Sequence, residues 1–87
     1  MADEKLKKKI YDVLKQGYFS DSTDFVDVSD GFDGLIHIVV VSRKFDGRRM
    51  KEKEDLIWSE LFQNLPIEEW GKVSLSIGVS PDEIKTL

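Results

Sequence analysis

The side chains best suited to bind a charged ligand lie in one run near the middle of the chain, SRKFDGRRMKEK. Its cations are Arg43, Lys44, Arg48, Arg49, Lys51 and Lys53. Guanidinium and ammonium groups at this density can contact the phosphates of a nucleic acid or the carboxylates of an acidic protein surface. The alternative is a solvated turn, in which Glu52, Glu54 and Asp55 balance these cations through pairs three or four positions apart. The residues themselves leave both interpretations open.

Metal and nucleophile chemistry have few candidates. The chain has no cysteine, which excludes thiolate catalysis, a self-contained zinc site and an all-protein iron–sulfur cage. His37 is the single histidine, so it is a candidate metal ligand. Its position in an alternating strand instead favours a half-exposed sheet residue on the face away from the helices. No nucleophile–base pair is visible, and we expect a protein that is not an enzyme.

Length and charge narrow the possible folds and functions of the protein further. With 87 residues, of which 40% are hydrophobic, we expect residues 1–87 to form a single domain with one core. The net charge of -4 argues against a protein whose whole surface binds phosphate, because the excess of positive charge is local, at +2 over residues 1–20 and +4 over residues 43–53. No apolar run approaches a membrane span, and the opening MADEKLKKKI does not resemble a signal peptide. We therefore expect a soluble, cytoplasmic protein that is a monomer or a weak homodimer.

Periodicity predicts the elements that must position these residues. Residues 4–16 carry an amphipathic helical stripe that Gly17 ends. A short strand is expected over 24–28, followed by a turn rich in Asp and Gly and by the β-branched strand LIHIVVVS. Helical spacing begins at Gly47 and ends at Asn64, before Pro66.

The last part of the chain predicts one more strand and a short helix. After a connector, LPIEEW, with one helical turn, KVSLSIGV alternates in the period of a half-buried strand, with Val73, Leu75, Ile77 and Val79 expected to point inward. SPDE then has the pattern of a capping box that opens a final helix. The order αββαβα predicts an α+β domain, in which a three-stranded sheet has its helices on one face.

Several of these segments together resemble the BolA-like family. VVVSRKFDGRRMKEKEDLIWSEL is similar to the strand, turn and helix signature of that family, and DVSDGFDG is similar to its glycine-rich hairpin loop. SLSIGVSPDEI is similar to its closing strand and helix start. The residues that match at the family's spacing are Val40, Val41, Ser42, Phe45, Gly47, Leu56, Ile57 and Leu61. The resemblance extends from about Val26 to Ile84.

The resemblance implies a fold like the type II KH arrangement and a non-enzymatic adaptor that pairs with monothiol glutaredoxins. It also implies a helix histidine that helps to hold a bridging [2Fe-2S] cluster. In this chain Lys53 stands at the first basic position of that motif, Glu54 replaces the histidine and Asp55 replaces the second basic residue. Phe32 and Asp33 occupy the loop region where a Cys or His ligand would be. A carboxylate is a hard oxygen donor that suits iron–sulfur clusters poorly.

The resemblance and the basic run together give the predicted site and function. The predicted partner-binding residues are Phe32, Arg43, Lys44, Phe45, Arg48, Arg49 and Lys53. We expect an adaptor for a monothiol glutaredoxin-like partner in iron–sulfur cluster handling or iron-linked regulation. Metal ligation should be weakened or lost. Any [2Fe-2S] cluster would be shared with the partner, with Glu54 as the first metal candidate and His37 as the second. The alternative is a nucleic-acid-binding transcriptional regulator that uses residues 43–53.

Overall fold

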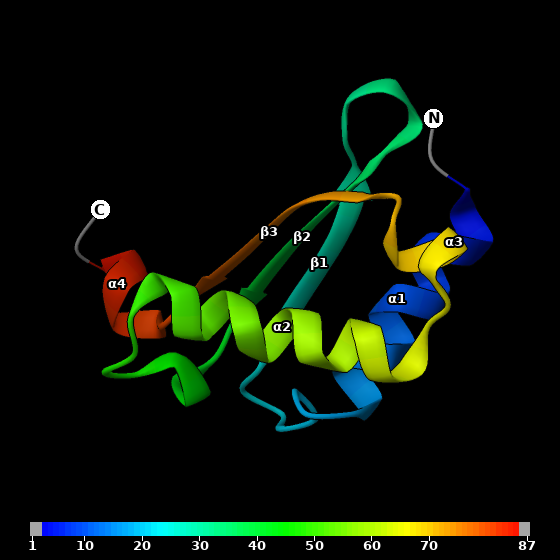
Figure 1. The fold of residues 1–87 in the computed structure, drawn as a ribbon. Helices are drawn as coiled ribbons and strands as arrows, with labels where there is room; N and C mark the ends of the chain where they lie inside the picture. The colour runs from blue at the N-terminus through cyan, green and yellow to red at the C-terminus, as the bar shows by residue number, and fades with distance from the viewer. Residues whose placement is uncertain (1–2, 86–87) are drawn as a thin grey trace.

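The computed structural model of this protein describes residues 3–85, and that part of the chain folds as an α+β domain (Figure 1). Its elements are α1 (Glu4–Gln16), β1 (Phe25–Asp30), β2 (Ile36–Val41), α2 (Met50–Asn64), α3 (Ile67–Trp70), β3 (Val73–Val79) and α4 (Pro81–Lys85), with 3₁₀ turns at Phe32–Gly34 and Arg43–Phe45. The predicted order αββαβα is confirmed, and α3 is the single turn expected between the second main helix and the last strand. Within the described residues, no helix is long and apolar enough to cross a membrane.

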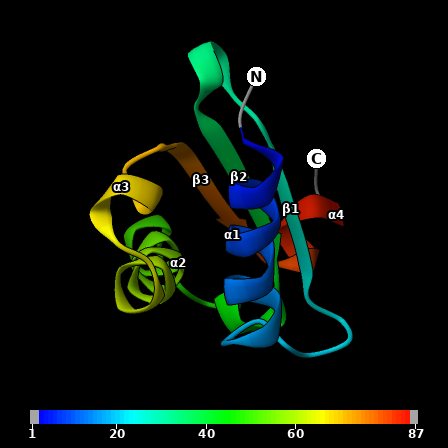
Figure 2. The same cartoon turned by 90° about the vertical axis from the view of Figure 1, so that its right-hand side faces the viewer.

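The three strands form one mixed sheet in the order β1-β2-β3. β1 and β2 form an antiparallel hairpin, whereas β2 and β3 run parallel and are joined through α2 and α3. A parallel pair needs such a crossover, because a tight turn can only join antiparallel strands. α1 and α2 lie side by side on the same face of the sheet (Figure 2). The arrangement with helices on one face is therefore as predicted.

The hydrophobic core fills the space between this helical layer and the sheet. Alternate residues of β2 (Ile36, Ile38 and Val40) are fully buried, and the residues between them are half-buried. From the helices, the buried side chains include Leu6, Ile10, Leu14, Ile57 and Leu61. Asp3 is the N-cap of α1, and its carboxylate accepts a hydrogen bond from the Lys5 backbone N–H at 2.9 Å.

β3 differs from the alternation that the sequence predicts. Ile36 pairs with Val73, but His37 pairs with Leu75, so the intervening Ser74 is an extra residue in a β-bulge. Beyond the bulge the inward and outward positions are exchanged. Ser76 is buried, whereas Leu75 and Ile77 are 42% and 40% exposed. The prediction that Leu75, Ile77 and Val79 point inward was therefore wrong, because one extra residue moves every following side chain to the other face.

Close packing explains why a glycine takes an inward position in β3. The ring of Phe45 is fully buried against Gly78, where an added Cβ would lie 2.9 Å from Phe45 Cζ. The same Cβ would lie 3.2 Å from Cβ of Lys53 in α2. Neither neighbour can move freely, because both are in the packed interior. Gly78 is thus the residue that lets the turn after β2 and the start of α2 lie against the sheet.

Two element boundaries also differ from those expected. β1 occupies Phe25–Asp30 rather than 24–28, because Asp24 is turned into a buried hydrogen-bond network. α2 begins at Met50 rather than at Gly47. The 3₁₀ turn Arg43–Phe45 comes first, and Gly47, with φ of 72°, reverses the chain before the helix begins.

Replacing Gly78 with alanine should lower the free energy of unfolding by about 1–3 kcal/mol, because the new methyl group overpacks the contact with Phe45. Gly-to-Ala changes that cause no clash usually stabilise a protein, so the sign of the effect is diagnostic. Urea unfolding followed by circular dichroism would measure it. The exposed Ser20→Ala variant, outside the strands and helices, is the control, with an expected change within about 0.5 kcal/mol. Equal stability of the two variants would contradict the packing described here.

Candidate functional site

The turn between β2 and α2 carries most of the predicted site residues, and a buried carboxylate organises it. The side chain of Asp24 is only 2% exposed. Its Oδ1 accepts a hydrogen bond from Ser42 Oγ at 2.7 Å, and its Oδ2 pairs with Lys44 Nζ at 2.7 Å. Ser42 Oγ also accepts a hydrogen bond from the Lys44 backbone N–H at 3.1 Å. A buried carboxylate is costly unless it is paired in this way, so the ammonium of the partly exposed Lys44 is occupied as the counter-ion of Asp24.

The same network fixes the loop between α1 and β1 to the turn. Lys15 Nζ donates hydrogen bonds to the backbone carbonyl oxygens of Asp21, at 3.0 Å, and of Asp24. The Lys44 ammonium also lies 5.4 Å from the centre of the Tyr18 ring, within the range of a cation–π contact. The basic turn is therefore held in one conformation by residues that precede β1.

Two further predicted partner-binding residues, Phe45 and Lys53, are buried. Phe45 is fully buried in the core. Lys53 Nζ lies 2.6 Å from both carboxylate oxygens of Glu83, and the Lys53 side chain is only 8% exposed. Glu83 in turn accepts a hydrogen bond from the Ser80 backbone N–H at 2.7 Å, which confirms the predicted capping box of α4. Lys53 thus attaches α4 to α2 and is not available to a partner.

Three predicted site residues remain on the surface of the turn, namely Arg43, Arg48 and Arg49. Arg43 Nη1 is 3.8 Å from Asp46 Oδ2, a long and exposed pair. Arg48 Nε donates to the backbone oxygen of Lys44 at 2.8 Å, which orients the guanidinium. Within residues 3–85, no carboxylate lies in ion-pair distance of Arg48 or Arg49. The turn therefore presents three guanidinium groups on a rigid support.

Phe32, also predicted to bind a partner, lies at the other end of the sheet. It begins the 3₁₀ turn of the β1–β2 hairpin and is 84% exposed. β2 separates this loop from the basic turn, and the two are at opposite ends of the strand (Figure 1). Phe32 and the three arginines do not form one contact surface.

The two candidate metal ligands are on different faces. His37 is on the sheet face away from the helices, as its alternation predicted, and its ring packs closely against Gly31. Glu54 is half-buried on α2. Among residues 3–85, no group of three or more His, Asp or Glu side chains converges as a metal site would require. With one oxygen donor at Glu54 and no thiolate, the residues present do not fit a cluster ligand set.

A small hollow beside Glu54 was not anticipated from the sequence. Its volume is about 230 Å³, and it lies where the start of α2, the outer edge of β3 and α4 meet. The hydroxyl of Ser76 is buried in its wall and has no hydrogen-bond partner within the described residues. No sequence pattern indicates this hollow, because Ser76 faces it only as a result of the bulge at Ser74.

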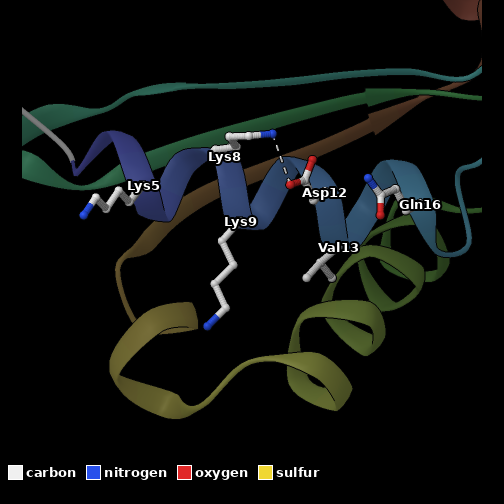
Figure 3. Close-up of a pocket in the computed structure, with 6 residues that line it drawn as sticks. All are labelled: Lys5, Lys8, Lys9, Asp12, Val13 and Gln16. Atoms are coloured by element: carbon white, nitrogen blue, oxygen red, sulfur yellow. Dashed lines mark hydrogen bonds and ion pairs between the residues drawn. The ribbon is translucent and has the colours of Figure 1, made fainter.

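A larger hollow of about 450 Å³ lies along α1. Its lining residues are Lys5, Lys8, Lys9, Asp12, Val13 and Gln16 (Figure 3). Two of its three lysines are paired, because Lys8 Nζ lies 3.3 Å from Asp12 Oδ2 and Lys9 Nζ lies 2.7 Å from Glu69 Oε1. Its cations are therefore largely balanced within the chain, and the hollow is a weaker candidate for an anion site than the basic turn.

An aromatic cluster covers the end of the core near α3. Trp58 and Trp70 are half-buried and pack against the core, as expected for core-rim residues. Phe62 is 54% exposed, and its ring centre lies 5.4 Å from that of Trp58 and 4.8 Å from that of Trp70. The acidic Glu68 and Glu69 flank this cluster in α3. A stacking platform for nucleic acid would need cations there instead.

Comparison with protein-family models, with curated proteins and with solved structures finds no match to this chain. The BolA-like resemblance therefore rests on the residues quoted above and remains a prediction. In the structure, Arg43, Arg48 and Arg49 lie exposed on the turn between β2 and α2. Contacts of Asp24, Phe45 and Gly78 hold this turn in place.

The ion pair that attaches α4 gives a pH prediction. The hydrogen bond from Lys53 and that from the Ser80 backbone hold the pKa of Glu83 below its ordinary value of 4.5. A lowered pKa in the folded state means that the pair stabilises the protein fully above the ordinary pKa. That stability is lost as pH falls through the lowered value. We therefore expect α4 to detach on acidification, at a pH below 4.5.

Carbon-detected NMR titration of the Glu83 carboxylate, with amide exchange in residues 81–85, would test this expectation. In a Lys53→Met variant, which retains a long apolar stem against Gly78, the pKa of Glu83 should move up toward its ordinary value. Titration of Glu83 at an unshifted pKa while Lys53 is present would show that the pair does not form in solution.

Proposed function

We propose that this protein is a non-enzymatic, BolA-like adaptor that uses Arg43, Arg48 and Arg49 to bind an acidic surface of a partner protein. The proposed partner is a monothiol glutaredoxin-like protein, and the proposed role is iron–sulfur cluster handling or iron-linked regulation. The cytoplasmic setting expected from the sequence is part of this proposal.

The observation that carries the proposal is the exposure of three arginines on a turn that cannot easily deform. Guanidinium groups present fixed forks of N–H donors, which match carboxylates with two parallel hydrogen bonds. A surface that is already in its binding conformation loses little entropy when a partner docks. Phe45 anchors the turn in the core and Asp24 fixes its first residues, which supports a turn that needs little reordering to bind.

The fold gives independent but coarser support. The order of elements and the mixed three-stranded sheet are compatible with the type II KH-like arrangement that the BolA-like resemblance implies. Since one fold hosts many functions, this agreement supports the scaffold of the proposal, whereas the partner rests on the resemblance alone.

The proposal does not assign a cluster ligand to this chain. Glu54 and His37 lie on different faces, and their chemistry does not fit a [2Fe-2S] ligand set. A cluster that is present in the complex would be held by residues of the partner. The adaptor would then recognise the protein surface around the cluster and leave its ligands unchanged.

Binding to a monothiol glutaredoxin should weaken about tenfold to a hundredfold in a triple variant with Arg43, Arg48 and Arg49 replaced by alanine, because each exposed ion pair contributes up to about 1 kcal/mol. The matched control removes three exposed lysines from other surfaces, namely Lys5, Lys8 and Lys72, and so makes the same change in net charge. Calorimetry with the apo and the cluster-loaded partner would measure both affinities.

Visible circular dichroism of the cluster-loaded complex tests the second part of the proposal. The cluster spectrum should be the same with the wild-type protein and with a Glu54→Ala variant, since Glu54 is not assigned as a ligand. A spectrum that depends on Glu54 would contradict this. No complex with either form of the partner would show that the assignment to glutaredoxins is wrong.

A nucleic-acid-binding transcriptional regulator is the second candidate, because the three exposed guanidinium groups would also suit phosphates. If this function is correct, a short DNA or RNA should bind at low salt. The slope of log affinity against log salt should be about -2 to -3, as expected for two or three phosphate contacts. Arg48→Ala and Arg49→Ala together should remove most of this slope. Absence of binding at low salt, in a fluorescence anisotropy titration, would reject the candidate.

A further inference from the structure

The sheet face opposite α1 and α2 carries apolar side chains on all three strands. The register aligns them in three rows, which are Phe25 with Val41 and Val79, Asp27 with Val39 and Ile77, and Ser29 with His37 and Leu75. Phe25, Leu75 and Ile77 are 56%, 42% and 40% exposed. These values show that no segment of residues 3–85 covers this face. We call these nine positions the open face.

The distribution of residues in β3 makes the open face unusual. Core burial alone would favour apolar side chains toward the helices and polar ones toward water. Beyond the bulge β3 does the reverse, with Ser76 and Gly78 on the helix side and Leu75 and Ile77 on the open face. Singly exposed apolar residues need no explanation, but a contiguous apolar patch across three strands marks an interaction surface.

The dimensions of the open face suit one helix. Three strands about 4.8 Å apart give a width of roughly 14 Å, and strands of six or seven residues extend about 20 Å. An α-helix with its side chains is about 10–12 Å wide, so one helix of about 14 residues would cover the face. It would also complete a third layer over a sheet that now has helices on one side only (Figure 2).

Charge decides which kind of helix fits. The three strands contain two carboxylates, Asp27 and Asp30, and no Lys or Arg. Asp30 pairs with Lys7 of α1 at 2.9 Å. Asp27 is exposed in the middle row, and within residues 3–85 no cation lies in ion-pair distance of it. A partner with a Lys or Arg beside its apolar stripe would pair with Asp27.

A second copy of this chain fits the open face less well. Stacking two open faces would bring their Asp27 carboxylates onto one apolar interface, between two chains that each carry a net charge of -4. The strand dimensions above give an area of roughly 14 by 20 Å, or about 280 Å², whereas a stable interface buries about 800 Å² on each partner. Both the charge and the area therefore favour a partner helix of opposite charge.

We infer that the open face is a docking surface for a cationic amphipathic helix of another protein. The apolar stripe of that helix would lie on Val39, Val41, Leu75 and Ile77, and a cation on its flank would pair with Asp27. This surface shares no residue with the basic turn, so the inference is independent of the function proposed above.

The test uses a fluorescein-labelled model peptide of about 14 residues, built from Leu and Lys at helical spacing, and a counterpart with Glu in place of Lys. Fluorescence anisotropy would give the affinity, and amide shifts in the ¹⁵N-labelled protein would give the location. We expect the Lys peptide to bind with shifts centred on β2 and β3. The Glu peptide should bind at least about tenfold more weakly.

Variants of the open face separate docking from general attraction to an acidic protein. The pair Leu75→Ser and Ile77→Ser should weaken the Lys peptide about tenfold or more, and Asp27→Asn should weaken it several-fold. The matched control is the pair Phe62→Ser and Ile67→Ser, which removes apolar side chains that are 54% and 63% exposed elsewhere. Binding should be unchanged in this control. If the amide spectrum shows that the double variant is not folded, the single variant Ile77→Ser replaces it in the test.

Three results would overturn the inference. The first is equal binding of the Lys and Glu peptides, and the second is shifts centred on α1 or α2 rather than on the sheet. The third is a concentration-dependent dimer of the wild-type protein, seen by light scattering and lost in Ile77→Ser, which would show that the open face binds a second copy instead.

Discussion

The Phe45 ring lies against the backbone of Gly78, and much of the molecule follows from that contact. Because no side chain fits at Gly78, β3 must present this residue to the helical layer. The bulge at Ser74 sets the alternation that does so, which also turns Leu75 and Ile77 to the outside. The same ring anchors the turn that carries the arginines. One packing contact thus determines both the conformation of the basic turn and the apolar character of the open face.

Electrostatics separates the six cations of residues 43–53 by role. Lys51 lies on the surface of α2, where it pairs with Asp55 at 3.3 Å. Lys44 and Lys53 are paired with Asp24 and Glu83, and they join segments that are far apart in the chain. Arg43, Arg48 and Arg49 remain on the surface. A count of positive charge therefore overstates the binding capacity of the turn, because the buried Asp24 carboxylate needs a cation of its own and Glu83 of α4 occupies the buried Lys53. Lys44 holds the turn and Lys53 holds α4, whereas the arginines are exposed to a partner.

Local patterns predicted the elements, and long-range contacts explain what they missed. The helical stripe of α1, the β-branched run of β2 and the capping box at Ser80 depend on neighbouring residues, so they could be read from the sequence. The pairing of Asp24 with Ser42 joins residues eighteen positions apart, and no local pattern signals it. The bulge at Ser74 was equally hidden, since strict alternation continues through KVSLSIGV and only the fit of Phe45 to Gly78 reveals which side is buried.

The separation of the hairpin loop from the basic turn has a consequence for assembly. β2 places Phe32 about 20 Å from the arginines, given six residues at about 3.3 Å each. A protein bound at one end leaves the other end accessible, because the extended strand between them keeps the two ends apart. The hairpin loop and the basic turn are therefore two separate surfaces, held at a fixed distance by β2.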